Sequence, residues 1–160
     1  MEYALGKLTV PPELALKFFA VFSRFEYALK VIPRFRRPGD GEAKADWLAF
    51  AAEVAPHFVP NKDPATSAAF TSLADANLRY FAVVDGEAKW RAFPVPEGIS
   101  DAEKAIRLIR QVRNNLFHGG KYAPDPDSNP DRERRWVESS LAILGKLLTL
   151  SNEVQAVYDN

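Results

Sequence analysis

Residues 100–121 read Ser-Asp-Ala-Glu-Lys-Ala-Ile-Arg-Leu-Ile-Arg-Gln-Val-Arg-Asn-Asn-Leu-Phe-His-Gly-Gly-Lys. Ser100 and Glu103 form a capping box, which predicts that a helix begins at Asp101. The pair Gly119-Gly120 predicts where that helix ends. Between these signals, apolar residues recur at spacings of four, three and four: Ala105, Ile109, Val112 and Leu116. The stretch therefore predicts an amphipathic helix with one apolar stripe against a core.

Similar patterns predict helices along most of the chain. They begin at prolines or capping residues and carry apolar side chains at helical spacing. The predicted segments run from Pro11-Pro12 to about Ile32, from Glu42 to about Ala55, from Asp63-Pro64 through Ala74, and from Asn129-Pro130 to about Tyr158. With the helix from Asp101, they predict an all-α protein, a four- to five-helix up-and-down bundle that forms a single domain over residues 1–160.

One segment departs from helical spacing. The pair Asp85-Gly86 stands between two short apolar and aromatic stretches, which is the strongest local signal for a β-hairpin. The sequence therefore predicts a small hairpin or an ordered loop near residues 81–91. One hairpin is too little to form a sheet core.

Composition excludes several classes of protein. A chain of 160 residues can bury roughly two-thirds of the surface of its unfolded form, so it needs no metal or disulfide for stability. The absence of cysteine excludes a thiol nucleophile and a Cys-ligated zinc, and it fits a cytoplasmic protein. No segment reaches the ~20 apolar residues of a membrane span, and no motif indicates a cofactor or metal site.

Charge gives a further constraint. The 21 basic and 21 acidic residues cancel, so contact with a nucleic acid must come from local clusters of charge. Residues 33–41 carry three arginines and form either a solvated turn or a patch that contacts phosphate. The run from Arg132 to Arg135 is typical of a solvated helix face, and His57, between two prolines, is typical of a spacer.

Projection of the helix from Asp101 separates its polar residues. With Leu116 at zero, Arg113 falls at about 60°, Asn114 at about 160° and His118 at about 200°. Arg113 therefore borders the core, where it needs a carboxylate partner, whereas Asn114 and His118 face away from the core. Glu26 is the candidate partner, because it also flanks a core stripe on its own helix.

The segment from Arg113 to His118 resembles the R-x4-H motif of HEPN domains, which are all-α ribonucleases of toxin–antitoxin, CRISPR and anti-phage systems. The polar Asn114 after the arginine is common in that family. The segments Ser23–Lys30 and His118–Lys121 also resemble stretches of stand-alone bacterial members. Toxins of the family that are silenced by modification often extend the motif to R-x4-H-x-Tyr, but here Gly120 stands at the position of the tyrosine.

The resemblance implies a metal-independent endoribonuclease that cleaves RNA by attack of the 2′-hydroxyl group. His118 would be the general acid or base, Arg113 would stabilise charge on the phosphate, and Asn114 would hold a phosphate oxygen. Glu26 and Lys30 would support these residues. Substrate would be bound by Arg110, Gly119, Gly120 and Lys121. Since cleavage needs an acid and a base, the resemblance implies a homodimer that brings two copies of His118 into one cleft.

Alternatives remain open for each of these residues. Gly119 and Gly120 can end a helix with no further role, His118 can interact with the helix dipole, and Arg113 can form a structural ion pair. Lys121 can belong to a solvated face. At the level of function, a toxin or defence effector with an antitoxin or other regulatory partner competes with a non-catalytic module that binds nucleotide or RNA or mediates dimerisation.

Overall fold

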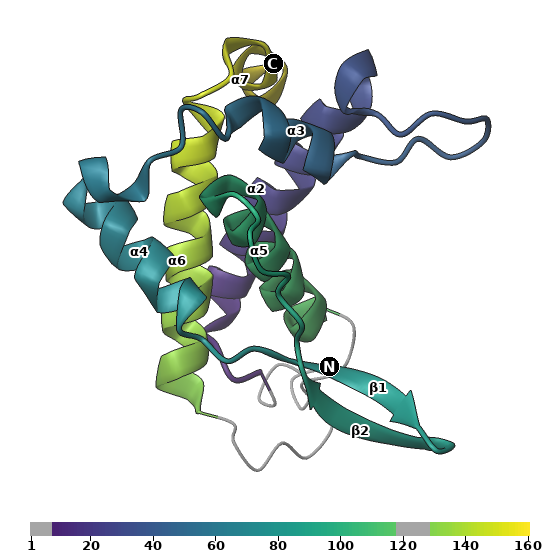
Figure 1. Ribbon diagram of the computed structural model, residues 1–160, viewed down its shortest axis with the longest axis vertical. Coiled ribbons are helices and arrows are strands. Elements are labelled where there is room, and N and C mark those ends of the chain that lie inside the picture. The colour runs from purple at the N-terminus through teal and green to yellow at the C-terminus, as the bar shows by residue number, and fades with distance from the viewer. Residues whose placement is uncertain (1–7, 118–128) are drawn as a thin grey trace.

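The computed structural model describes residues 8–117 and 129–160, which are mostly helical with one small antiparallel sheet (Figure 1). The predicted helical fold and the predicted hairpin are therefore confirmed. The helices are α2 (Pro12–Val31), α3 (Trp47–Val54), α4 (Pro64–Ala74), α5 (Asp101–Phe117), α6 (Pro130–Leu148) and α7 (Asn152–Asp159), with short 3-10 turns η1 (Pro33–Phe35) and η2 (Pro60–Lys62). The strands are β1 (Arg79–Val84) and β2 (Glu87–Ala92).

Three predicted helix starts are confirmed by their capping hydrogen bonds. The side chain of Asp63 accepts from the Thr66 amide at 2.8 Å, and Asn129 Oδ1 accepts from the Arg132 amide at 3.0 Å. Ser100 Oγ accepts from the Glu103 amide at 3.2 Å. Each bond satisfies one of the backbone N–H groups that a helix leaves without a partner at its first turn.

The helix predicted from Glu42 is shorter than expected and begins at Trp47. Asp46 is its N-cap, and Asp46 Oδ1 accepts from the Ala49 amide at 3.0 Å. The preceding residues instead return along the chain from residue 36, with a β-bridge between Arg36 and Ala45. Residues 36–46 therefore form a projecting arm, called the 36–46 arm below (Figure 1).

The helix predicted to end near Tyr158 is two helices. α6 ends at Leu148, and Ser151 caps α7 by accepting from the Val154 amide at 3.5 Å. The described residues thus contain six α-helices, whereas the sequence predicts four to five. The break turns α7 back against α2, where Arg24 Nε donates to the Tyr158 carbonyl at 2.8 Å.

The core lies where α2, α5 and α6 pack together, with α3 and α4 against them. Aromatic rings join α2 to α3: the rings of Phe22 and Phe25 stack on Trp47 at centroid distances of 5.0 Å and 5.5 Å. Phe25 also contacts Phe50 edge to face at 5.3 Å. Buried aromatic rings contribute heavily to core stability, so α3 is held firmly beside α2.

The hairpin turns at Asp85 and Gly86, which both have positive φ (53° and 78°), as a type I′ turn requires. β1 and β2 pair with Val84 opposite Glu87. The hairpin is attached to α5 because Asn115 Nδ2 donates to the Arg79 carbonyl at 2.8 Å, and Gln111 Nε2 donates to the same carbonyl at 3.2 Å. The hairpin and the 36–46 arm project on the same side of the helices (Figure 1).

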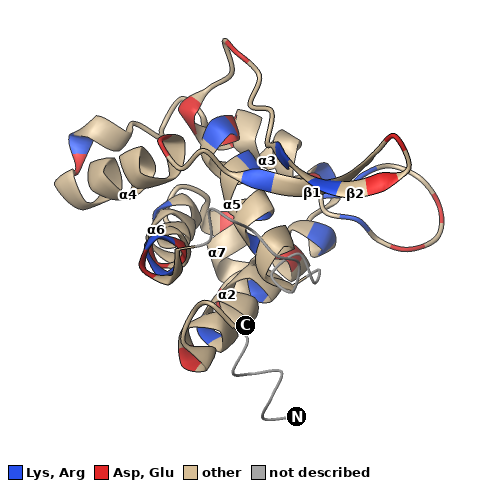
Figure 2. Cartoon of the chain, turned by 90° about the horizontal axis from the view of Figure 1, so that it is seen from below, with Lys and Arg blue, Asp and Glu red and all other residues tan. Residues whose placement is uncertain are grey.

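Within residues 8–117 and 129–160, no helix has both the length and the apolar character needed to cross a bilayer. Acidic and basic residues are interspersed along the helices and the hairpin (Figure 2), in keeping with the net charge of zero. Any concentration of positive charge is therefore local, and one such concentration lies beside α5.

Candidate functional site

The polar face of α5 is arranged as its sequence predicts. Val112 and Leu116 are buried in the core, Arg113 is half-buried at the edge of the apolar stripe, and Asn114 is exposed. The side chain of Asn114 therefore faces away from the core and is available to a ligand or partner.

Arg113 contacts Phe22 and Asn114. Its guanidinium lies 5.5 Å from the centre of the Phe22 ring, a cation–π contact that keeps the side chain against α2. Its Nη1 donates to Asn114 Oδ1 at 3.2 Å. Because the amide oxygen of Asn114 accepts this bond, its Nδ2 group remains oriented as a donor, suited to a phosphate oxygen.

Glu26 was predicted to be the partner of Arg113, and the structure shows a local ion pair instead. Glu26 Oε1 lies 2.9 Å from Lys30 Nζ, one turn further along α2. A glutamate four residues before a lysine favours this pairing on any helix. Glu26 still lies on the same pocket wall as Arg113, so the two helices meet as expected.

A pocket of about 250 Å³ lies between α2, α5 and the 36–46 arm. It gathers five of the residues selected from the sequence, which are Glu26, Lys30, Arg110, Arg113 and Asn114. The remaining lining residues are Phe22, Arg37, Glu42, Ala43, Lys44, Ala45 and Trp47. Five basic and two acidic side chains line this pocket, a formal charge of +3, so it is called the basic pocket below.

Arg110 lies half-buried in the basic pocket. Burial lowers the pKa of its guanidinium, and the nearby charges of Arg37, Arg107 and Arg113 lower it further, whereas Glu26 opposes the shift. Both causes reflect the cost of holding a charged guanidinium away from water among like charges. An anion bound in the basic pocket would offset that cost.

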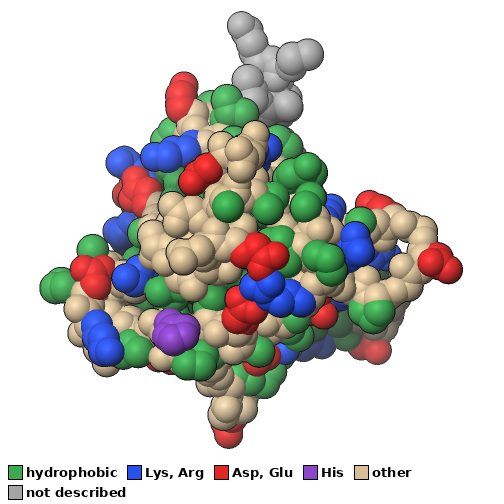
Figure 3. Space-filling model, turned by 90° about the horizontal axis from the view of Figure 1, so that it is seen from above, with side chains coloured by type: hydrophobic (Ala, Val, Ile, Leu, Met, Phe, Trp, Pro, Cys, Tyr) green, Lys and Arg blue, Asp and Glu red, His purple; other side chains and the backbone are tan. Residues whose placement is uncertain are grey.

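The basic residues of the 33–41 loop divide into different roles. Arg34 donates from Nε to Glu53 at 2.7 Å and also pairs with Glu153, so it joins η1 to α3 and α7. These carboxylates raise its pKa. Figure 3, which looks onto this end of the molecule, shows acidic and basic side chains in contact. Arg34 is thus structural, whereas Arg37 lines the basic pocket.

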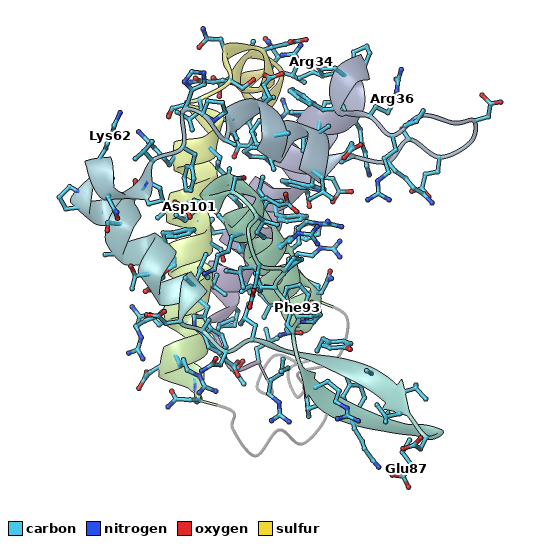
Figure 4. All side chains as sticks on the ribbon, viewed as in Figure 1. Arg34, Arg36, Lys62, Glu87, Phe93 and Asp101 are labelled. Carbon is cyan, nitrogen blue, oxygen red and sulfur yellow. The ribbon has the colours of Figure 1, made fainter. Side chains whose placement is uncertain are left out.

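Arg37 and Lys44 were not selected individually from the sequence. They stand on opposite sides of the 36–46 arm, where the Arg37 amide donates to the Lys44 carbonyl at 2.9 Å. In Figure 4, basic side chains of the arm, on which Arg36 is labelled, and of α5 project into the space between the two elements. The signal in the sequence was the basic loop itself, but which arginine turns toward α5 depends on the fold of the arm.

Four predicted site residues, His118, Gly119, Gly120 and Lys121, lie outside the described residues. His57 is exposed in the connector after α3, in agreement with a spacer. Arg134 pairs with Glu138 at 2.8 Å along α6, in agreement with a solvated helix face. Among the described residues, no three His, Asp or Glu side chains are grouped as metal ligands would be.

A second pocket, of about 560 Å³, lies between α2 and α6, with Tyr158 of α7 also in its lining. Its walls are mainly apolar, with Val21, Phe25 and Leu144 among them. Lys17 and Glu138 are the charged residues in that lining, as far as residues 8–117 and 129–160 are concerned. None of the described residues predicted to bind or cleave RNA lines it, so the basic pocket is the stronger candidate site.

No protein-family model matches the chain, and comparisons with curated proteins and with solved structures found no match either. The chemistry of the basic pocket therefore has to be inferred from its own side chains.

Proposed function

We propose that the chain is a HEPN-like, metal-independent endoribonuclease whose substrate strand lies in the basic pocket. The observation that carries the proposal is the convergence of five residues, selected from the sequence as site or supporting residues, on this single pocket. They come from two helices separated by some 80 positions of sequence, so their meeting is not a consequence of local spacing.

The charge of the basic pocket supports a polyanionic substrate. A chain with no net charge has no general attraction for RNA, yet a formal charge of +3 is concentrated between α5 and the arm. Phosphate groups are the part of a nucleic acid that such a cluster binds. A neutral or cationic substrate would not reduce the net positive charge of the basic pocket.

The proposed reaction uses three residues of the R-x4-H segment. His118 removes the 2′-hydroxyl proton or protonates the 5′-oxygen that leaves, and the second copy of the chain supplies the other proton-transfer group. Arg113 stabilises the negative charge that develops on the phosphate, and Asn114 Nδ2 donates to a phosphate oxygen. The 2′-oxygen bonds to phosphorus as the bond to the 5′-oxygen breaks, which leaves a 2′,3′-cyclic phosphate and a 5′-hydroxyl end.

In a cell, such an enzyme would act on cytoplasmic RNA as a toxin or an anti-phage effector. An antitoxin or another regulatory protein could silence it by covering the basic pocket. Modification of a tyrosine two residues after His118 is not available, because Gly120 occupies that position.

The direct test is incubation of the purified protein with a broad set of single-stranded RNAs in the presence of EDTA. We expect fragments that end in 2′,3′-cyclic phosphate, identified by mass spectrometry. RNA that is bound but remains intact would favour the non-catalytic binding module. RNA that is neither bound nor cut would contradict both functions.

The proposed homodimer would use an exposed apolar surface on α2 and α5. Leu16 and Phe19 on α2 are 67% and 52% exposed, and the Phe19 ring contacts the exposed ring of Phe117 at 5.7 Å. Phe117 is three residues from Asn114 on α5, so this apolar surface adjoins the proposed active site. Large exposed apolar surfaces commonly mark protein interfaces.

We therefore expect light scattering at tens of micromolar to give twice the 17.9 kDa mass of one chain. Phe19→Lys should shift the protein to a monomer and lower RNA cleavage in parallel, because it places a charge in the apolar interface. Val83→Lys is the control, since Val83 is 74% exposed on the hairpin, away from α2. A wild-type monomer that cleaves RNA would contradict the composite site.

A further inference from the structure

We propose that the base of the 36–46 arm is a second phosphate-binding site for the RNA strand, in which Arg37 and Lys44 hold a backbone phosphate beside the one that Arg113 contacts. This inference rests on the proposed function, because it assumes that the polyanion is a strand of RNA. It assigns a role to an arm that the R-x4-H segment does not include.

The base of the arm is well fixed. Beside the β-bridge between Arg36 and Ala45, the Asp46 amide donates to the Phe35 carbonyl at 2.7 Å. Phe35 and Trp47, on either side of the arm, are 1% and 3% exposed and anchor both of its ends in the core. The backbone that carries Arg37 and Lys44 is therefore held in place before a ligand binds, which lowers the entropy lost on binding.

The cations of this region have few carboxylates to neutralise them. Glu26 is paired with Lys30, and Glu103 is paired with Arg107 at 2.8 Å. In the part of the chain that the structure describes, Arg37, Lys44 and Arg110 form no ion pair. Glu26 and Glu42 also line the basic pocket, but five cations outnumber them, so the excess positive charge can bind a second phosphate.

The walls of the basic pocket indicate contact with the sugar-phosphate backbone, not with bases. Phe22 and Trp47 are its aromatic lining residues, but both are buried and their rings stack on each other. Bases stack on exposed ring faces, which these two residues do not offer. Binding at the arm should therefore be independent of RNA sequence.

The test is the salt dependence of binding to a fluorescein-labelled single-stranded RNA of ten nucleotides, measured by fluorescence anisotropy in EDTA. His118→Ala is present in every protein to prevent cleavage. Each lost phosphate contact on a single strand should reduce the magnitude of the slope of log K against log salt concentration by about 0.7. We expect this change from Arg37→Ala and from Lys44→Ala, with affinity at moderate salt lowered about three- to tenfold.

Arg36→Ala is the matched control. It removes the same charge from the neighbouring position, but Arg36 is exposed and does not line the basic pocket. Its slope should stay close to that of the parent protein. Equal effects of Arg36→Ala and Arg37→Ala would overturn the proposal, because the positive charge of the arm would then attract RNA without a specific phosphate contact.

Competition by adenosine 5′-monophosphate tests whether the arm binds an RNA strand or a free nucleotide. The nucleotide should compete with the labelled RNA only weakly, because it supplies one phosphate in place of two. Competition as strong as that of the unlabelled RNA would overturn a strand-binding arm. The proposed function can fail separately from this inference. If the protein with His118 present binds RNA through Arg37 but does not cut it, the phosphate site on the arm stands and the nuclease does not. If RNA is cut equally well without Arg37 or Lys44, the nuclease stands and the phosphate site on the arm does not.

Discussion

His118→Ala should lower the single-turnover rate of RNA cleavage by about 10²–10⁴-fold, the range expected when a general acid or base is removed. RNA binding should change little, because the charges of Arg37, Lys44, Arg110 and Arg113 remain. The thermal unfolding midpoint should also stay near that of the wild type, so that the loss is one of chemistry and not of folding.

His57→Ala is the control for this variant. His57 and His118 are the chain's two histidines, and His57 is exposed in the connector after α3, outside the lining of the basic pocket. Its replacement should leave the rate of cleavage within about twofold of the wild type, in line with the small effects of surface substitutions. Equal rates for the two variants would remove His118 from the mechanism.

Arg113→Ala should lower the rate of the chemical step by about 10²–10³-fold, the usual cost of removing a group that stabilises a developing oxyanion. Arg113→Lys should recover only part of this loss, because an ammonium group keeps the charge but lacks the planar fork of a guanidinium. The loss should appear mainly in kcat, since the other cations of the basic pocket still bind the strand.

A purely structural role for Arg113 predicts a different outcome. Loss of its cation–π contact with Phe22 should cost about 1 kcal/mol, measured by urea unfolding, and leave a folded protein. Arg107→Ala is the matched control on α5, because Arg107 pairs with Glu103 and does not line the basic pocket. If Arg113→Ala and Arg107→Ala lower kcat to the same extent, Arg113 has no special part in the reaction.

Local signals in the sequence predicted much of the fold. Asp63, Ser100 and Asn129 cap helices where expected, because capping depends on residues within one helical turn. The half-buried position of Arg113 and the exposure of Asn114 also follow from helical periodicity alone. These features need no information about distant parts of the chain.

Two helix boundaries were mistaken although a signal was present. Asp46 is a good N-cap, but Ala43 and Ala45 favour helix and made the start appear earlier than it is. In the same way, Val154 and Val157 continue the apolar spacing of α6 through the break, and the cap at Ser151 was overlooked. In both cases, residues beyond the capping residue have the propensity or the spacing of a helix, so the pattern extends past the true boundary.

The candidate site was predictable only in part, because its remaining residues depend on tertiary structure. Helix projection indicated that Glu26 and Arg113 border the same core. It did not show that Glu26 pairs with Lys30, four residues further along the same helix. Arg37 and Lys44 meet because the chain reverses between them. No periodic pattern marks which arginine of a loop faces a helix.

The central claim is that a strand bound in the basic pocket is cut by attack of its own 2′-hydroxyl group. The most direct test compares one RNA with the same sequence carrying 2′-O-methyl groups throughout, both incubated with the wild-type protein in EDTA. We expect both to bind with similar affinity, and only the unmodified RNA to be cut to fragments ending in 2′,3′-cyclic phosphate. Cleavage of the methylated strand, or no cleavage of either, would contradict the central claim.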